Sequence, residues 1–168
     1  MYNHVIWPKQ YDPKTSAIYA LNDIDVNAPP EVVWKSLVDA KNWWSYFPAE
    51  DQVKILSGEP ELALGTKWTR VTVGIPTRLI VTECVPISRL AWSTTVDGDE
   101  TGSSAFHGWV ITPMGNGCHV LSEETQQAPS SSRNSGARIP VRSTAITRNG
   151  SNALRARLRL KSFDFTKG

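Results

Sequence analysis

The sequence IDVNAPPEVVWKSLVDAKNWWSYFP, residues 24–48, decides the fold of this 168-residue chain. It begins with the alternation of a half-buried strand, because the apolar Ile24 and Val26 flank the acidic Asp25. The Asn-Ala-Pro-Pro run over residues 27–30 then interrupts the strand. Proline suits the first turn of a helix, where its missing N–H group would have no partner in any case. We therefore predict a strand that ends before the prolines and a helix that follows them.

The residues after the prolines have helical spacing. Four apolar side chains recur every three or four positions and would share one buried helix face: Val33, Trp34, Leu37 and Val38. A second, short and aromatic helix is predicted over residues 42–47, and Pro48 ends it. A strand over residues 18–26 is thus followed by two short helices.

The chain then contains six segments that are typical of β-strands. Glycine-containing turns or short loops separate them, which favours an antiparallel meander that curves around something. The predicted strands cover residues 53–56, 65–73, 77–85, 89–96, 103–112 and 118–126. The fold class is therefore α+β, with a curved antiparallel sheet of about seven strands and two short helices after the first strand.

The composition is that of a globular protein with a sizeable core. A hydrophobic content of 40% and seven tryptophans are not typical of a disordered chain. No apolar run approaches the ~20 residues of a membrane span, and residues 1–14 lack the apolar core of a signal peptide. We expect a cytoplasmic protein in which Cys84 and Cys118 are reduced, buried thiols.

The net charge of +2 conceals an asymmetry along the chain. Residues 1–128 carry nine Lys or Arg and fifteen Asp or Glu, whereas residues 129–168 carry nine basic residues and a single aspartate. The segment over residues 129–150 is rich in Ser, Arg, Asn and Gly, which makes it a poor helix. Apolar and basic residues alternate over residues 154–161, which is strand periodicity.

The predicted order of elements resembles the helix-grip fold of the START-like and birch-pollen-allergen-like superfamily (SRPBCC). Four segments are similar to its polyketide cyclase/dehydrase and lipid-transport branch: IDVNAPPEVVWKSLVDAKNWWSYFP, ALGTKWTRVTV, TECVPISRLAW and WVITPMGNGCHVLSEETQ. The resemblance covers about residues 17–127 and consists of hydrophobic and turn patterns, without an invariant catalytic set. It implies a seven-stranded sheet that grips a long C-terminal helix, with an apolar ligand cavity between them.

We divide the chain into a START-like ligand-binding domain over residues 1–127, with an N-terminal extension over residues 1–16, and an atypical basic tail over residues 128–168. The tail departs from the family pattern, so the C-terminal helix is not predicted from these residues. The tail is a solvated extension, a contact for nucleic acid or anionic membrane, or the product of a reading-frame shift near Ala128. We expect it to cover the concave face incompletely.

His107 is the candidate catalytic residue. It shares a strand face with Trp109 and Ile111, and Trp92 would lie on the same face one strand earlier. A histidine on an aromatic concave face would be a general acid or base, or a ligand anchor. The alternative is a structural histidine that a neighbouring strand satisfies.

The candidate ligand-binding residues are aromatic or polar side chains expected near that face: Trp34, Trp44, Trp68, Arg70, Trp92, Thr94, Trp109 and Glu124. We predict that Trp92 and Trp109 lie on the concave face with Trp34 or Trp44 beside them. Arg70 and Arg78 would clamp an anionic ligand group, or keep a hairpin edge soluble. The adjacent Glu123 and Glu124 point to opposite faces, so at most one of them faces inward.

These residues support three functional hypotheses. The first is binding of a hydrophobic small molecule, lipid or polyketide-like, in an apolar cavity. The second is a polyketide cyclase/dehydratase-type enzyme with His107 as acid or base, which an inward His107 beside a second polar group would favour. The third is a chaperone-activator-like interaction module, which an exposed apolar patch would favour. We expect no metal and no cofactor, because the chain lacks zinc-like Cys/His spacing and a phosphate-binding glycine loop.

Overall fold

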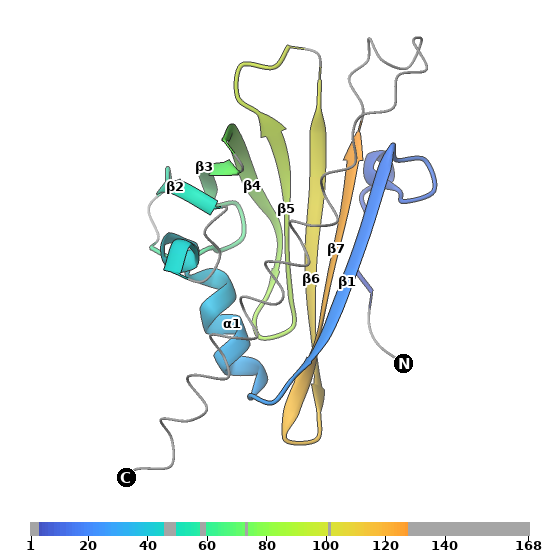
Figure 1. Cartoon of the computed structure of the whole chain (residues 1–168), viewed down its shortest axis with the longest axis vertical. Coiled ribbons are helices and arrows are strands. Elements are labelled where there is room, and N and C mark those ends of the chain that lie inside the picture. Colours follow the sequence, from blue (N-terminus) through green and yellow to red (C-terminus); the bar gives the residue numbers. More distant parts are fainter. Residues whose placement is uncertain (1–3, 46–49, 58–59, 73, 101, 128–168) are drawn as a thin grey trace.

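The computed structural model describes residues 4–45, 50–57, 60–72, 74–100 and 102–127. Within these residues, seven strands, one α-helix and two 3₁₀ helices form an α+β fold, as predicted (Figure 1). The elements are η1 (Lys9–Tyr11), β1 (Ile18–Val26), α1 (Pro30–Val38), η2 (Ala40–Ser45), β2 (Glu50–Ile55), β3 (Lys67–Thr72), β4 (Ile75–Val85), β5 (Arg89–Val96), β6 (Ser104–Met114) and β7 (Gly117–Gln127). The predictions for the tail over residues 128–168 lie outside the described residues.

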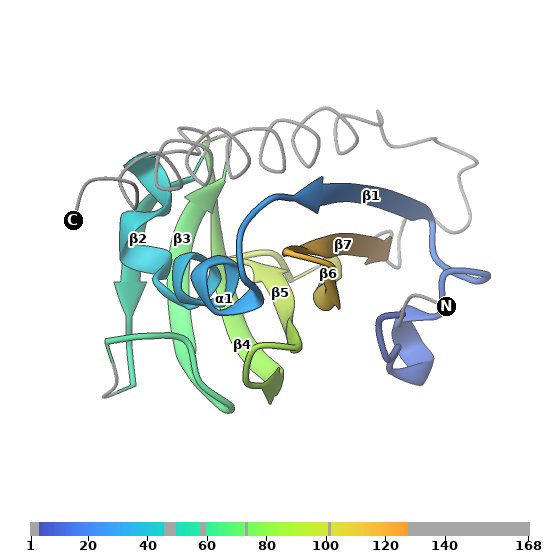
Figure 2. The same cartoon turned by 90° about the horizontal axis from the view of Figure 1, so that it is seen from below.

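The strands form one antiparallel sheet in the order β1-β7-β6-β5-β4-β3-β2. Six consecutive strands are neighbours in this order, which is the predicted meander, and β1 closes it by pairing with β7. Figure 2 shows the strands curving around α1, so the sheet has a concave face toward the helix and a convex face away from it. The curved antiparallel sheet with a helix on its concave face agrees with the predicted helix-grip fold, and the C-terminal helix that the resemblance implies would lie outside the described residues.

Two local boundaries differ from the sequence prediction. The second helix is a 3₁₀ helix over Ala40–Ser45, two residues earlier than predicted. The turn between β3 and β4 is centred on Gly74, whose φ of +81° suits glycine, while Ile75 and Pro76 already pair with β3. Both shifts are small.

The main hydrophobic core lies between α1 and the concave face. Val33, Leu37 and Val38 of α1 are buried against it, as the helical spacing predicted. The strands contribute a larger set of buried side chains: Val26, Trp68, Leu79, Val81, Leu90, Trp92, Ile111, Cys118 and Val120. Each large apolar side chain that is fully buried contributes about 1.5–3 kcal/mol relative to an exposed one, so this core is the main source of stability.

A second, smaller core covers the convex face. The N-terminal residues Val5 and Tyr11 are buried there against strand side chains: Ala91, Phe106, Val110 and Leu121. The Tyr11 ring stacks on Phe106 with 5.4 Å between ring centroids, and Trp7 lies 5.6 Å from the same ring. Trp7 and Tyr11 thus hold the N-terminal segment against the domain.

Polar contacts hold the N-terminal segment in register on the convex face. The backbone N–H of Val5 donates to Glu123 Oε2 (3.1 Å), and the Tyr19 hydroxyl donates to Glu123 Oε1 (2.5 Å). Burial and then the hydrogen bond and charge of Glu123 raise the pKa of Tyr19. Val5 also lies directly over Gly108, where an added Cβ would come within 2.5 Å of Val5 Cγ1. A side chain at position 108 would therefore displace this segment.

Candidate functional site

The candidate site is built on one row of residues that crosses the sheet. His107 of β6 is paired with Trp92 of β5 on one side and with Glu124 of β7 on the other. Directly paired residues of antiparallel strands project to the same face, so all three side chains lie together. Because Trp92 belongs to the core beneath α1, this common face is the concave one. His107 therefore faces inward beside a second polar group.

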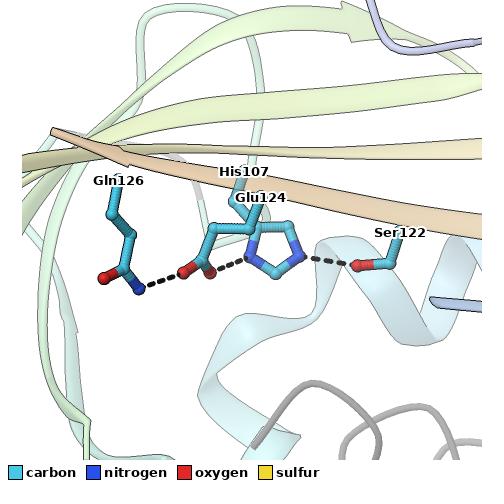
Figure 3. A network of polar contacts seen from close by, with 4 residues as sticks. All are labelled: His107, Ser122, Glu124 and Gln126. Atoms are coloured by element: carbon cyan, nitrogen blue, oxygen red, sulfur yellow. Dashed lines mark hydrogen bonds and ion pairs between the residues drawn. The ribbon is translucent and has the colours of Figure 1, made fainter. Parts of the chain in front are cut away.

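Both ring nitrogens of His107 have partners, as Figure 3 shows. Nδ1 lies 2.9 Å from Glu124 Oε2, and Nε2 lies 2.8 Å from the Ser122 hydroxyl oxygen. The Gln126 amide donates to the other oxygen of Glu124 at 2.6 Å. An ionised carboxylate only accepts hydrogen bonds, so Nδ1 carries the hydrogen that it shares with Glu124. In the neutral imidazole, Nε2 is then the acceptor.

Two indoles hold the imidazole between them. The His107 ring stacks on Trp92 at 5.0 Å between centroids and on Trp109 at 5.3 Å, with interplanar angles of 22° and 14°. The two stacking contacts and the hydrogen bonds at both nitrogens together fix the orientation of the His107 ring. The histidine is thus preorganised in a largely apolar setting.

The carboxyl group of Glu124 stays ionised to low pH. Burial by itself would raise its pKa, but the hydrogen bond and charge of His107, the hydrogen bond from Gln126 and the charge of Arg70 outweigh burial and lower the pKa to about 2. Glu124 therefore supplies a permanent negative charge next to the imidazole at neutral pH. Such a charge orients the ring.

Three tryptophans and one arginine lie next to this network. Trp43 of η2, Trp68 of β3 and Trp92 form a cluster with 5.5–5.8 Å between ring centroids. The guanidinium carbon of Arg70 lies 5.3–5.8 Å from all three centroids, within the range of cation–π attraction. An arginine thus brings its positive charge onto the aromatic part of the concave face.

A family model described as polyketide cyclase/dehydrase and lipid transport matches residues 22–159. The chain belongs to this family. The match begins in β1 and continues past Gln127 into the basic tail. No curated protein matches the sequence.

Solved structures with the same fold are numerous and distant in sequence. A hypothetical protein from Helicobacter pylori has a TM-score of 0.78 at 19% identity, over 94% of this chain and 97% of that one. A norcoclaurine synthase mutant from Thalictrum, solved with a transition-state analogue, has a TM-score of 0.65 at 14% identity, over 86% of this chain and 96% of that one. The protein Ara h 8.0201 has a TM-score of 0.63 at 12% identity, over 84% of this chain and 97% of that one. At these identities the similarity shows the helix-grip fold alone.

The structure of this polyketide cyclase/dehydrase family member brings most of the predicted site residues together. Trp68 and Trp92 are buried in the main core, Trp34 and Trp109 pack against it, and Thr94 lies half-buried on the same strand face as Trp92. The predicted concave position of Trp92 and Trp109 is therefore confirmed. Their role as ligand-binding residues stays a prediction.

Trp44 requires a correction. Its side chain is 64% exposed, whereas the neighbouring Trp43 is buried and donates its indole N–H to the Leu37 carbonyl at 3.2 Å. The sequence prediction chose the wrong member of this pair, because consecutive residues of a short helix point in different directions. Trp43 takes the position in the aromatic cluster.

The prediction that Arg70 and Arg78 together clamp an anionic ligand group is also wrong. Arg70 is paired with Thr77 and Arg78 with Thr69, so the two arginines lie on opposite faces of the hairpin. Arg78 forms an exposed ion pair with Asp97 at 2.7 Å. Only Arg70 reaches the aromatic face.

Sequence reasoning missed Ser122 and Gln126, although a signal for both was present. They lie two residues before and two residues after Glu124 in β7, so the alternation of a strand places all three on one face.

Among the residues that the structure describes, no group of three acidic, histidine or cysteine side chains could hold a metal ion. None of the described helices is long and apolar enough to span a membrane.

Proposed function

We propose that this chain binds a hydrophobic small molecule, polyketide-like or lipid, on the concave face and converts it with His107 as general acid–base. The observation that carries this proposal is the inward imidazole, held by Glu124 and Ser122 and stacked between Trp92 and Trp109. An inward histidine beside a second polar group is the feature that separates an enzyme from a simple apolar binding site.

The His107–Glu124 pair has the properties of an acid–base catalyst. A histidine whose Nδ1–H is held by a carboxylate presents Nε2 as the base, and the carboxylate stabilises the imidazolium that forms. Removal of a proton next to a carbonyl, and its return to a departing hydroxyl, are the steps of an aldol-type cyclisation and dehydration. Without substrate, the Ser122 hydroxyl is hydrogen-bonded to His107 Nε2. During the reaction this hydroxyl therefore has to move away from Nε2 or pass the proton between Nε2 and the substrate.

The surroundings of the pair favour a flat or elongated apolar substrate with a polar end. The indoles of Trp92 and Trp109 supply aromatic area next to the imidazole, and Trp68 extends this area beyond Trp92. Arg70 supplies a positive charge that would attract an enolate, a carboxylate or another anionic group.

The test is proton exchange at carbon. A synthetic aromatic 1,3-diketone serves as the probe, and NMR in D₂O follows loss of its α-proton signal in the presence of the protein. We expect catalysed exchange, reduced about 10²–10⁴-fold in His107→Gln, the usual contribution of a general base. Tryptophan fluorescence quenching by the same probe should persist in this variant.

His119→Gln is the matched control. His119 is also a buried histidine with a carboxylate partner, since its Nδ1 lies 2.7 Å from Asp25, but it is on the opposite face of β7 from Glu124. Exchange should be unchanged in this variant. If exchange is absent from the native protein, or equally reduced in both variants, His107 is not the base.

A carrier without turnover is the second candidate, and one observation favours it. Both nitrogens of His107 already have protein partners, which is also what a structural histidine would have. Binding of the diketone without any catalysed exchange would support this function. The chaperone-activator-like module and the cytoplasmic location stay predictions.

A further inference from the structure

Ser122, His107 and Glu124 form a continuous hydrogen-bonded chain (Figure 3). The hydroxyl oxygen lies 2.8 Å from one nitrogen of the imidazole, and the carboxylate lies 2.9 Å from the other. This is the order of nucleophile, base and orienting acid in enzymes that transfer acyl groups, which are recognised by geometry and not by fold. The low pKa of Glu124 keeps the third member charged.

The neighbours of Ser122 supply a second, independent observation. In the sheet, Ser122 is paired with Asn22 of β1 on one side and with Trp109 of β6 on the other, so their side chains lie on its face. The amide nitrogen of Asn22 and the indole nitrogen of Trp109 are both buried, and neither has a hydrogen-bond partner within the described part of the chain. Buried donors without an acceptor are costly. Two such donors on either side of a serine could stabilise the oxyanion of a tetrahedral intermediate.

We infer that Ser122 is the nucleophile of an acyl-transfer site that hydrolyses esters or thioesters of apolar carboxylic acids. His107 is its base, Glu124 is the positioning residue, and Asn22 and Trp109 are the oxyanion donors. This activity goes beyond the proposed function. It shares His107 with a cyclase but gives Ser122 a covalent role that a cyclase does not need.

Each step can be written with its protons. Ser122 Oγ attacks the carbonyl carbon and its proton passes to His107 Nε2, while the carbonyl oxygen becomes an anion facing Asn22 and Trp109. The carbonyl re-forms, the carbon–oxygen or carbon–sulfur bond breaks, and the leaving alcohol or thiol takes the proton from Nε2. Water then adds to the acyl-serine, gives its proton to Nε2, and the acid departs as Ser122 regains a proton. One ester and one water yield one acid and one alcohol.

The surroundings of Ser122 restrict the substrate. The serine is 1% exposed, and the side chains two positions away on its own and the adjacent strand, Val120 and Ile111, are apolar core residues. The acyl group that reaches Ser122 therefore has to be apolar and slim. Esters of charged or branched acids should be poor substrates.

Covalent labelling of the full-length protein tests the assignment. Treatment with an alkyl fluorophosphonate, in which Ser122 Oγ would displace fluoride, is followed by peptide mass spectrometry, and hydrolysis of p-nitrophenyl butyrate is measured in parallel. We expect one adduct per chain, at Ser122, and a burst of one p-nitrophenol per chain. Ser122→Ala should abolish both signals, and His107→Gln should slow labelling at least a hundredfold.

Two further variants keep the test independent of folding. Ser36→Ala removes another buried serine, on α1, whose hydroxyl donates to the Val32 carbonyl, and should leave labelling and hydrolysis unchanged. Asn22→Ala should slow acylation about a hundredfold while far-UV circular dichroism stays native, because one oxyanion donor is lost. If the Asn22→Ala variant is acylated at a near-native rate, the assignment of Asn22 as an oxyanion donor is wrong.

The outcomes separate this inference from the proposed function. No adduct at Ser122 after exhaustive treatment of the folded native protein overturns the acyl-transfer site, whether or not diketone exchange is seen. Exchange that persists in Ser122→Ala, with loss of labelling, supports both assignments. If the native protein is labelled at Ser122 but catalyses no diketone exchange, Ser122 remains the nucleophile and the proposed acid–base function of a cyclase is wrong.

Discussion

Two adjacent glutamates of β7 occupy opposite faces of the sheet, and both are largely buried. Glu123, on the convex face, accepts from the Val5 backbone N–H and the Tyr19 hydroxyl, which are groups that do not ionise near neutral pH. Glu124, on the concave face, contacts an imidazole and lies in the field of an arginine. The same residue type thus holds a segment of chain on one face and orients a histidine on the other.

The difference shows how to recognise a functional carboxylate in a sheet that is buried on both sides. Burial alone does not distinguish Glu123 from Glu124, because both side chains are shielded from water. Their partners do, since only Glu124 contacts a group that can take up a proton in a reaction. Of the predictions below, which run from the largest expected effect to the smallest, those for Glu124 and Glu123 test this contrast directly.

The aromatic core of the concave face should be the part of the structure least tolerant of change. Trp68→Ala removes a fully buried indole that contacts Trp43, Trp92 and Arg70, and should reduce the free energy of unfolding by about 3–5 kcal/mol. Urea denaturation measures it. Trp44→Ala, at an exposed position of η2, is the matched control and should change stability by less than about 0.5 kcal/mol. Equal losses would contradict the assignment of the two faces of η2.

Glu124→Gln should change how stability depends on pH. The folded-state pKa of about 2 lies below the ordinary value of 4.5, so the unfolded chain takes up the proton first as the pH falls. The native protein therefore gains up to about 3 kcal/mol above pH 4.5 and loses it as the pH falls toward 2. In urea titrations at a series of pH values, the free energy of unfolding of the variant should lack this decrease between pH 4.5 and 2. A native and a variant curve of the same shape would mean that the carboxylate is not held as described.

Glu123→Gln should act on the N-terminal segment and spare the concave face. A glutamine amide cannot accept from both the Val5 N–H and the Tyr19 hydroxyl, so a buried donor loses its partner at a cost of about 1–3 kcal/mol. Limited proteolysis should cut within residues 4–16 faster than in the native protein. Labelling at Ser122 and diketone exchange should stay within twofold. A larger change in either would mean that the two faces are coupled through β7.

The two thiols should react at different and slow rates. Both cysteines are free, but Cys118 is fully buried while Cys84 is only half-buried, which corrects the prediction of two buried thiols. Burial and the nearby charge of Glu31 raise the pKa of Cys118 to about 11, and burial also raises the pKa of Cys84. With a disulfide reagent at pH 8, Cys84 should label first and Cys118 only on unfolding. Cys84→Ser isolates the slow phase, and rapid labelling of that variant would contradict the burial of Cys118.

Much of the concave face was predictable because its pattern is local. Alternation within β5 and within β6 places Trp92 with Leu90, and His107 with Trp109, without any knowledge of the partner strand. The same rule applied to β7 would have placed Ser122 and Gln126 beside Glu124. The order of strands followed from the short turns of the meander.

The rest depends on register and on helix type, which are not local. The contact of His107 with Ser122 and Glu124 requires the exact pairing of β6 and β7, and the position of Asn22 requires the pairing of β1 with β7, about 100 residues later. Likewise, a 3₁₀ helix turns each residue by a different angle from an α-helix, which exchanged Trp43 for Trp44. Such features result from packing of the whole domain and leave no short-range signal.

The contact between Val5 and Gly108 has a consequence for the evolution of this family. Gly108 lies between His107 and Trp109, and its missing side chain makes the room that Val5 fills on the other face. A lineage that acquires any larger residue at this position can no longer seat an N-terminal segment here, and one that loses the segment has no reason to keep the glycine. The extension and the glycine should therefore be inherited together, so that a homologue with a longer side chain at this point of β6 should leave its convex face bare or cover it with a different part of the chain.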